Sequence, residues 1–171
     1  MKIPEKITGY SVYRNGSTYL GTADVELPNL EALTETIKGA GIAGEVDSPT
    51  IGHFSSMTCT LNWRTVDPAS IELNAPELHS LDFRAAQQVL DSALGTYSSV
   101  PVKVSVRAIP KTLNLGKFEV GATTDTSNEL EVVYLKIIHD GKVTTEIDKF
   151  NSICIINGKD YLAAERAALG K

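Results

Sequence analysis

The sequence predicts a single, mainly β domain with one short internal helix and a short C-terminal helix. Three observations support this prediction. Apolar and polar residues alternate with a period of two over several runs, which is typical of half-buried antiparallel strands. Asn-Gly and Asp-Gly pairs separate some of these runs and favour tight hairpin turns. Helix signals occur at only two places.

The strands are expected in the following order along the chain. Tyr10 to Arg14 and Tyr19 to Leu27 flank Asn15-Gly16, whose residues tolerate positive φ, so they predict a hairpin. The next two strands each place apolar residues on one face: Met57, Cys59, Leu61 and Trp63 in the first, and Leu81, Phe83 and Ala85 in the second. Val100 to Ala108 follows, and Leu130 to Ile138 and Val143 to Ile147 flank Asp140-Gly141 as a last hairpin.

The two helices are marked by their ends. Asp67-Pro68 is an N-cap followed by a proline at the first helical position, and Pro76 must end this short helix. The second helix, from Asp160 to Leu169, is rich in alanine and leucine and is expected to stop at Gly170.

Composition limits the possible classes of function. The 171 residues suffice for one domain over residues 1–171, and 42% hydrophobic and 22% charged residues are normal for a soluble globular protein. The net charge of -5 provides no basic surface for gripping nucleic acid. The start of the chain, from Met1 to Lys6, predicts no secretory signal, and no apolar run predicts a membrane span. Cys59 and Cys154 are expected to be buried and reduced.

The sequence offers little evidence for a catalytic site or a cofactor-binding site. His53, His79 and His139 lie far apart without metal-ligand spacing, and the common zinc and P-loop motifs are missing from the sequence. Gly39, Gly41 and Gly44 match the letters of a dinucleotide fingerprint, but the predicted sheet is antiparallel and offers no βαβ unit. We therefore expect no catalytic residue, no bound metal, no cofactor and no enzymatic activity.

The segment from Lys38 to Asp47 contains few large side chains, so it cannot build a core of its own. We expect it to be a mobile loop that becomes ordered on a partner and ends at a turn formed by Ser48-Pro49. The predicted interface residues are Gly39, Ala40, Gly41, Ile42, Gly44, Glu45, Val46 and Asp47.

The second face of the predicted strands also bears on function. It carries many Ser, Thr, Lys and Glu residues, and aromatic residues make up only 6% of the chain. A ligand-binding barrel usually has inward-facing aromatic residues. A polar second face instead suits a sheet that lines water inside a larger ring, which also closes the exposed strand edges.

Many short segments, in order, resemble the major tail tube protein of contractile-tailed bacteriophages, a family shared with R-type bacteriocins. The resemblance runs nearly end to end. The segments are Val12 to Gly21, Leu27 to Leu30, Gly39 to Asp47, Met57, Leu61, Trp63, Arg84 to Gln88, Arg107 to Lys111, Leu115-Gly116, Glu146 to Asn151, Asn157 to Tyr161 and Arg166. In the Arg107-Ala108 match, an alanine stands where the family would have a glycine.

The resemblance implies a β-sandwich or barrel-like subunit that forms hexameric rings with a shared inner β-barrel. The rings would stack into the inner tube of a virion tail or bacteriocin particle, assembled in the bacterial host cytoplasm. Implied partners are further copies of the chain, the sheath outside, the tape-measure protein in the lumen, and the baseplate and tail-terminator proteins. In a phage, DNA would pass through without specific binding, which an acidic lumen would suit. The membrane is not an implied partner.

Several alternatives remain open at this point. The tube of a type VI secretion system shares the fold, although its sequences look different at the glycine-rich loop. A monomeric ligand-binding β-barrel is the interpretation from a separate class. Either the Tyr10 to Leu27 hairpin or the Leu130 to Ile147 hairpin is expected to line the lumen, and the helix around Tyr161 to Leu169 is expected to pack outside.

Overall fold

The computed structural model describes residues 1–21 and 24–171. The elements within these ranges are β1 (Lys2–Arg14), β2 (Thr18–Leu20), β3 (Asp24–Glu26), β4 (Ala32–Ile37), β5 (Val46–Phe54), β6 (Thr58–Trp63), α1 (Pro68–Glu72), β7 (His79–Asp91), β8 (Thr96–Asn114), β9 (Thr126–His139), β10 (Lys142–Asp148), β11 (Ile153–Ile156), β12 (Lys159–Asp160) and α2 (Ala163–Ala168). The predicted mainly β class is confirmed.

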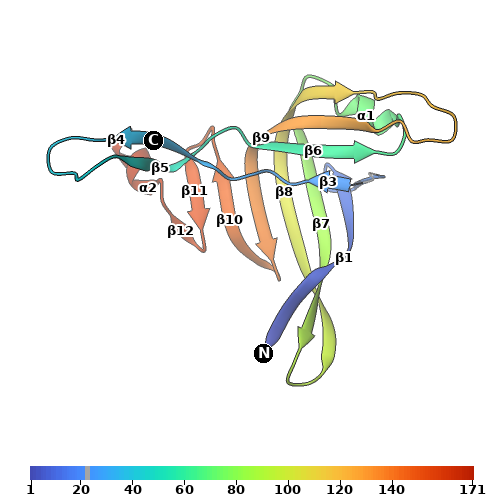
Figure 1. The fold of residues 1–171 in the computed structure, drawn as a ribbon, viewed down its shortest axis with the longest axis horizontal. Coiled ribbons are helices and arrows are strands. Elements are labelled where there is room, and N and C mark those ends of the chain that lie inside the picture. The colour runs from blue at the N-terminus through green and yellow to red at the C-terminus, as the bar shows by residue number, and fades with distance from the viewer. Residues whose placement is uncertain (22–23) are drawn as a thin grey trace.

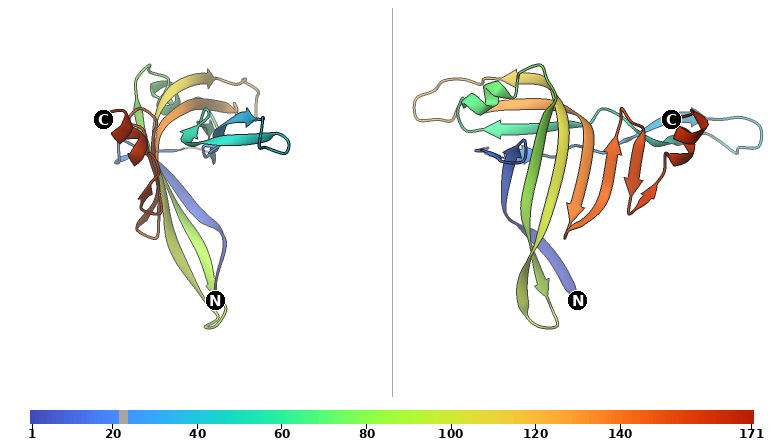
Figure 2. Two further views of the ribbon diagram at one scale, coloured as in Figure 1. Left: turned by 90° about the vertical axis from the view of Figure 1, so that its left-hand side faces the viewer. Right: turned by 180° about the vertical axis from the view of Figure 1, so that it is seen from behind.

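Two antiparallel layers share their longest strands. The larger layer has the order β12-β11-β10-β9-β8-β7-β1-β2 (Figure 1). β6 pairs with the first half of β9, and β3 pairs with β6. Because β8 and β9 stay paired from Asn114 and Ser127 to Val102 and His139, they continue from one layer into the other. Figure 2 shows the second layer folded over the upper part of the first.

The core fills the space between these layers, with the alternation that the sequence predicts. Its members are Val12, Leu20, Met57, Cys59, Leu61, Trp63, Leu73, Leu81, Phe83, Val104, Val106, Ala108, Leu130, Val132, Leu135, Ile147, Cys154 and Leu162. Trp63 donates its indole N–H to Asn128, whose own amide donates to the carbonyl of Ser70. These bonds satisfy buried polar groups and attach α1 to the sheet.

The first predicted hairpin is confirmed, but its second strand is much shorter than predicted. Val12 opposes Leu20 across a turn in which Asn15 and Gly16 have positive φ. The predicted strand from Tyr19 to Leu27 is wrong as one element, because β2 pairs with β1 whereas β3 pairs with β6 in the other layer. The part of that prediction at Thr22 and Ala23 lies outside the described residues.

Both predicted helices are present, and the second is shorter than predicted. Asp67 caps α1 by accepting a hydrogen bond from the backbone N–H of Ala69 at 2.8 Å. α2 begins at Ala163 because Asp160 belongs to β12, where its carboxylate binds Arg166. Gly170 follows α2 with a φ of +72°, as expected of a stop.

Three strands extend beyond the core. The N-terminal part of β1, the second half of β7 and the first half of β8 form a twisted extension below the two layers (Figures 1 and 2). The sequence prediction missed the N-terminal part of β1, which begins at Lys2 rather than near Tyr10. Polar and charged residues interrupt the alternation there, so the pattern signal is weak.

Candidate assembly interface

β4 and β5 form a two-stranded ribbon, here called the arm, that belongs to neither layer. It projects from the side of the molecule that carries β12 and α2 (Figure 1). Leu33, Ile37, Val46 and Ile51 are all exposed large apolar residues of this arm. The arm therefore buries little apolar surface within its own chain.

The predicted interface residues lie at the end of this arm. Gly39, Ala40, Gly41, Ile42, Gly44 and Glu45 belong to the tip, Lys38–Glu45. The prediction that Val46 and Asp47 belong to a loop is wrong, since both are in β5. Ser48-Pro49 is likewise not a turn. In the part of the chain that the structure describes, only β4 pairs with β5, so the missing N–H of Pro49 costs no ladder bond on the other side.

The tip has a defined conformation. Gly41 and Gly44 have φ values of +90° and +125°, which other residues rarely adopt. The N–H of Ile42 donates to the carbonyl of Gly39 at 3.1 Å, and Lys38 lies 3.8 Å from Glu45 across the end of the ribbon. At the adjoining rung, Thr36 donates to Asp47 at 2.8 Å. The predicted interface thus forms one continuous, solvent-exposed surface.

The larger sheet has an open edge on each side. Among the described residues, no strand pairs with the outer side of Lys2–Ser11 in β1. Pro4 and register shifts at Glu5 and Thr8 interrupt this edge. At the other side, β12 contains only two residues, so half of β11 has one strand partner. Unpaired edges are available to strands of another chain, while prolines, bulges and charges limit indiscriminate pairing.

The extension below the core is amphipathic. On the face that continues the core, Ile7, Tyr10, Val25, Leu27 and Ala85 line a groove of about 290 Å³. Ile7 is 51% exposed and Leu27 is 55% exposed. Ile7, Tyr10 and Ala85 belong to β1 and β7, whereas Val25 lies in β3 and Leu27 follows it, so the groove lies between the extension and the second layer.

The opposite face of the sheet is polar. Asp82 accepts a hydrogen bond from Ser105 at 2.7 Å and lies within 3.5 Å of both Arg84 and Lys103. On neighbouring strands, Lys136 opposes Glu146 in the register. Acidic and basic groups therefore alternate across these strands.

Tyr134 connects the charges further along the same face. Its hydroxyl donates to Glu146 at 3.0 Å, and the guanidinium of Arg107 lies 5.0 Å from its ring centre. Burial, followed by the hydrogen bond to Glu146, raises the pKa of Tyr134 above its ordinary value. The phenol therefore stays neutral at physiological pH.

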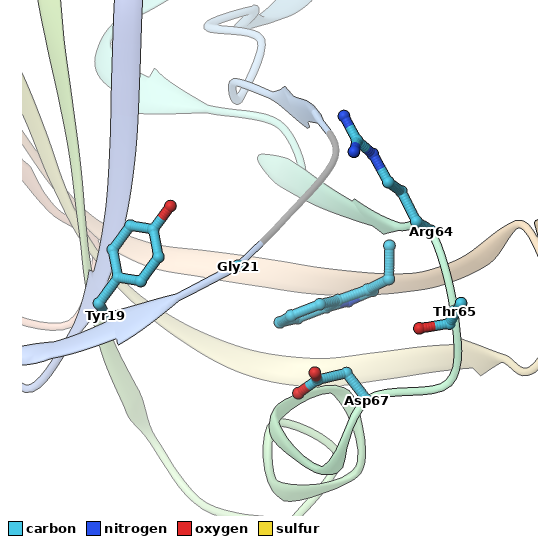
Figure 3. Close-up of a pocket in the computed structure, with 6 residues that line it drawn as sticks. Tyr19, Gly21, Arg64, Thr65 and Asp67 are labelled. Carbon is cyan, nitrogen blue, oxygen red and sulfur yellow. The ribbon is translucent and has the colours of Figure 1, made fainter.

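A depression between β2 and α1 lacks the arrangement of an active site. Figure 3 shows Tyr19, Gly21, Arg64, Thr65 and Asp67 around it. The carboxylate in this depression belongs to Asp67 and already accepts the hydrogen bond that caps α1. Tyr19 instead makes an edge-on ring contact with Tyr13, with the centroids 5.8 Å apart.

The titratable residues singled out in the sequence are dispersed. His53 lies 3.1 Å from Glu165, the buried His79 contacts the carbonyl of Ala75, and His139 contacts Gln87. Residues 1–21 and 24–171 hold no group of three or more potential metal ligands. Burial raises the pKa of Cys59 to about 12, so its thiol is unreactive. No helix in the described ranges is long and apolar enough to cross a membrane.

A sequence model of the phage tail tube protein FII family matches residues 4–170, nearly the whole chain. The chain belongs to this family. It is a tail tube protein, which confirms the resemblance seen in the sequence.

A curated relative and a solved structure agree with the FII assignment. The tail tube protein of Escherichia phage P2 is 29% identical over 177 residues, covering 99% of each chain. The sheath/tube terminator of the PVC extracellular contractile injection system, in its extended state, superposes with a TM-score of 0.54. That match has 18% identity and covers 80% of this chain and 97% of the terminator, and it supports the fold.

Proposed function

We propose that this tail tube protein forms hexameric rings that stack into the hollow inner tube of a contractile tail. The observation that carries this proposal is the amphipathic extension with its open edge on β1. One face of the extension leaves Ile7 in solvent beside the exposed Leu27 that follows β3, and one edge leaves main-chain groups unpaired. A neighbouring copy supplies both an apolar cover and strand partners, and repeating the contact around an axis closes the sheet into a barrel.

The polar face of the sheet is the proposed wall of the lumen. It contains Asp82, Glu146 and Asp148 together with Arg84, Arg107, Lys103 and Lys136. These groups compensate one another across strands, so this wall is close to neutral rather than acidic. A compensated wall still suits passage of DNA, because tight phosphate binding needs an excess of Lys and Arg.

The arm is the proposed contact between subunits. Its tip residues, from Gly39 to Glu45, together with Val46 and Asp47, lie on an exposed ribbon that reaches beyond the sandwich. Fixing a flexible residue costs about 1–2 kcal/mol. Because β4 and β5 already hold the base of the tip, docking orders fewer residues than docking of an unstructured loop.

The remaining partners of the proposed assembly follow from the tube design. The sheath surrounds the tube, the tape-measure protein occupies the lumen before firing, and the baseplate and tail-terminator proteins contact its ends. The particle is a virion tail or a headless bacteriocin, assembled in the bacterial host cytoplasm.

Cryo-electron microscopy of the purified protein tests this function. The expected result is stacked six-membered rings whose inner wall is a continuous β-barrel containing β7, β8 and β9. A compact monomer at every concentration, measured by light scattering, would contradict the proposal. Such a result would instead favour the ligand-binding alternative, although within residues 1–21 and 24–171 the larger sheet ends at β2 and β12 and does not close into a barrel.

A further inference from the structure

The loop between β8 and β9, Leu115–Asp125, holds two apolar side chains in solvent. Phe118 is 90% exposed and Val120 is 105% exposed. Single exposed apolar residues are common on protein surfaces, so exposure alone does not indicate a contact. The base of this loop, however, is built in a way that fixes where Phe118 projects.

Gly116 and two buried threonines form that base. A Cβ on Gly116 would lie 1.7 Å from the carbonyl oxygen of Thr124, and its φ is +76°, so only glycine fits. Thr124 and Thr126 share a hydroxyl hydrogen bond of 2.8 Å, and Thr126 also donates to the carbonyl of Leu115. The N–H of Thr124 donates to the carbonyl of Arg64, just beyond the end of the β6–β9 ladder.

The end of the loop is also organised. The N–H of Ala122 donates to the carbonyl of Glu119 at 3.2 Å, which closes a turn beyond Phe118. Lys117 and Glu119 form an ion pair of 3.0 Å on either side of the aromatic residue in sequence. Phe118 is therefore an apolar knob on a preformed support, and binding it costs little conformational entropy.

The knob and the arm lie at opposite ends of the molecule. The strands of the larger sheet follow one another along the long axis, with the β8–β9 loop at one end and the arm, β12 and α2 at the other (Figure 1; Figure 2, right). In a ring whose sheet continues from subunit to subunit, this axis runs around the circumference. The loop therefore points toward the next subunit and not toward the sheath.

The end with α2 offers a matching depression. Gly52, Phe54, Ile147, Ser152 and Leu162 contribute to the lining of a hollow of about 150 Å³. Cavities of about this volume can hold a benzene ring. Gly52 fixes one wall of the hollow, because a Cβ there would lie 2.6 Å from Cγ of Leu162, so only glycine lets Leu162 pack against the backbone of β5.

The rim of the hollow also carries suitable charges. His53, Asp148 and Lys149 belong to its lining, and His53 lies 3.1 Å from Glu165. Lys117 and Glu119 flank the knob, so each has a group of opposite sign available on the rim.

We propose that Phe118 of each subunit inserts into the hollow beside Gly52 and Leu162 of the next subunit in the same ring. This contact rests on the proposed ring assembly and names the surfaces that meet in it. It is distinct from the contact made by the arm.

Cysteine cross-linking in assembled tubes tests the contact directly. Phe118→Cys combined with Ser152→Cys should give a ladder of covalent oligomers on a denaturing gel after a short bismaleimide is added. The ladder should end at the subunit number of one ring. The natural cysteines are buried, and the two single variants control for them. Phe118→Cys with Ser98→Cys is a matched pair outside the hollow and should stay monomeric.

Two outcomes of this experiment would overturn the contact. One is tubes of the first pair that remain monomeric on the gel, and the other is a ladder that continues beyond one ring, which means a contact between rings. Failure of the proposed ring assembly can be distinguished from failure of this contact alone. If the ring assembly is wrong, the unaltered protein forms no rings in micrographs, and the contact is then wrong as well.

A second measurement does not depend on cross-linking. Phe118→Ala should raise the critical concentration for assembly about tenfold or more, the effect of truncating an anchoring aromatic residue. The unfolding midpoint of the monomer should not move, because the side chain is exposed. Phe118→Leu retains apolar bulk and should show a smaller increase. A critical concentration for Phe118→Ala within about threefold of the unaltered protein would contradict the contact.

Discussion

The sandwich and the arm are both built from antiparallel strands, but they differ in how far their apolar side chains are buried. In the sandwich, Met57, Leu61 and Leu130 are fully buried within one chain. In the arm, Leu33, Val46 and Ile51 remain exposed although β4 and β5 are paired. The difference shows that the sandwich buries its apolar side chains within one chain, whereas the arm would gain apolar burial only in the proposed assembly. Mutations in the two regions should therefore separate folding from polymerisation.

The largest effect on folding is expected in the sandwich. Leu130→Ala removes a fully buried side chain between the layers and should lower the free energy of unfolding by about 2–5 kcal/mol. Urea denaturation of the monomer measures this change. Ile42→Ala in the arm tip is the comparison variant, and it should alter the same quantity by less than about 0.5 kcal/mol. Equal losses would mean that the arm contributes to the fold.

The converse effect is expected at the arm tip. Gly41→Val and Gly44→Val place a β-branched residue at positive φ, which costs about 1–2 kcal/mol locally. The monomer should keep its circular dichroism spectrum but form no tubes. Ala43→Val adds the same bulk in the tip without positive φ and should interfere less. Full-length tubes of the glycine variants in electron micrographs would refute the role of the arm.

A smaller loss is expected where α1 joins the sandwich. Asp67→Ala removes the acceptor for the N–H of Ala69 and should cost about 1 kcal/mol. Thermal unfolding of the monomer measures it, and Asp67→Asn should recover most of the loss because asparagine also caps helices. Tube formation should be unchanged for both variants, unless the depression of Figure 3 is a contact surface.

The smallest effect is a local response of α2 to pH. The hydrogen bond with Arg166 lowers the pKa of Asp160 below its ordinary value. A lowered carboxyl pKa means that the attachment of α2 is fully present above the unfolded-state pKa and is lost as pH falls through the folded-state pKa. Hydrogen exchange at Arg166 and Leu169 should therefore accelerate in acid. Asp160→Asn should show that faster exchange at neutral pH, and unchanged protection would contradict the idea.

The sequence predicted the parts of the fold in which local patterns agree with tertiary burial. Alternation identified the strands around Leu61, Phe83 and Val106, and Asn15-Gly16 identified the first hairpin. Ser48-Pro49 was misassigned as a turn because an edge strand tolerates proline. The first half of β1 was missed because nearly all of its side chains are exposed, so no buried period appears in the sequence.

The candidate interface was predictable only in part. Glycine content identified the tip of the arm, since small residues predict a segment without a core. The sequence did not indicate β4 and β5 as its support, because nearly every side chain in β4 is exposed and no buried period appears. The sequence pattern around Phe118 also did not indicate a contact residue. Its significance comes from Gly116 and Thr124, whose close approach is visible only in three dimensions.

The interrupted edge of β1 has a consequence for the timing of tail growth. Pro4 and the two register shifts disfavour non-specific pairing of this strand with other strands. Newly made chains should therefore not aggregate, even at high concentration. In the proposed assembly, rings should therefore start slowly from free subunits and faster on a prepared surface that presents several docking positions at once. A subunit of this kind should add to an existing end faster than it starts a new one, so the structure that seeds a tail would decide where the tail begins.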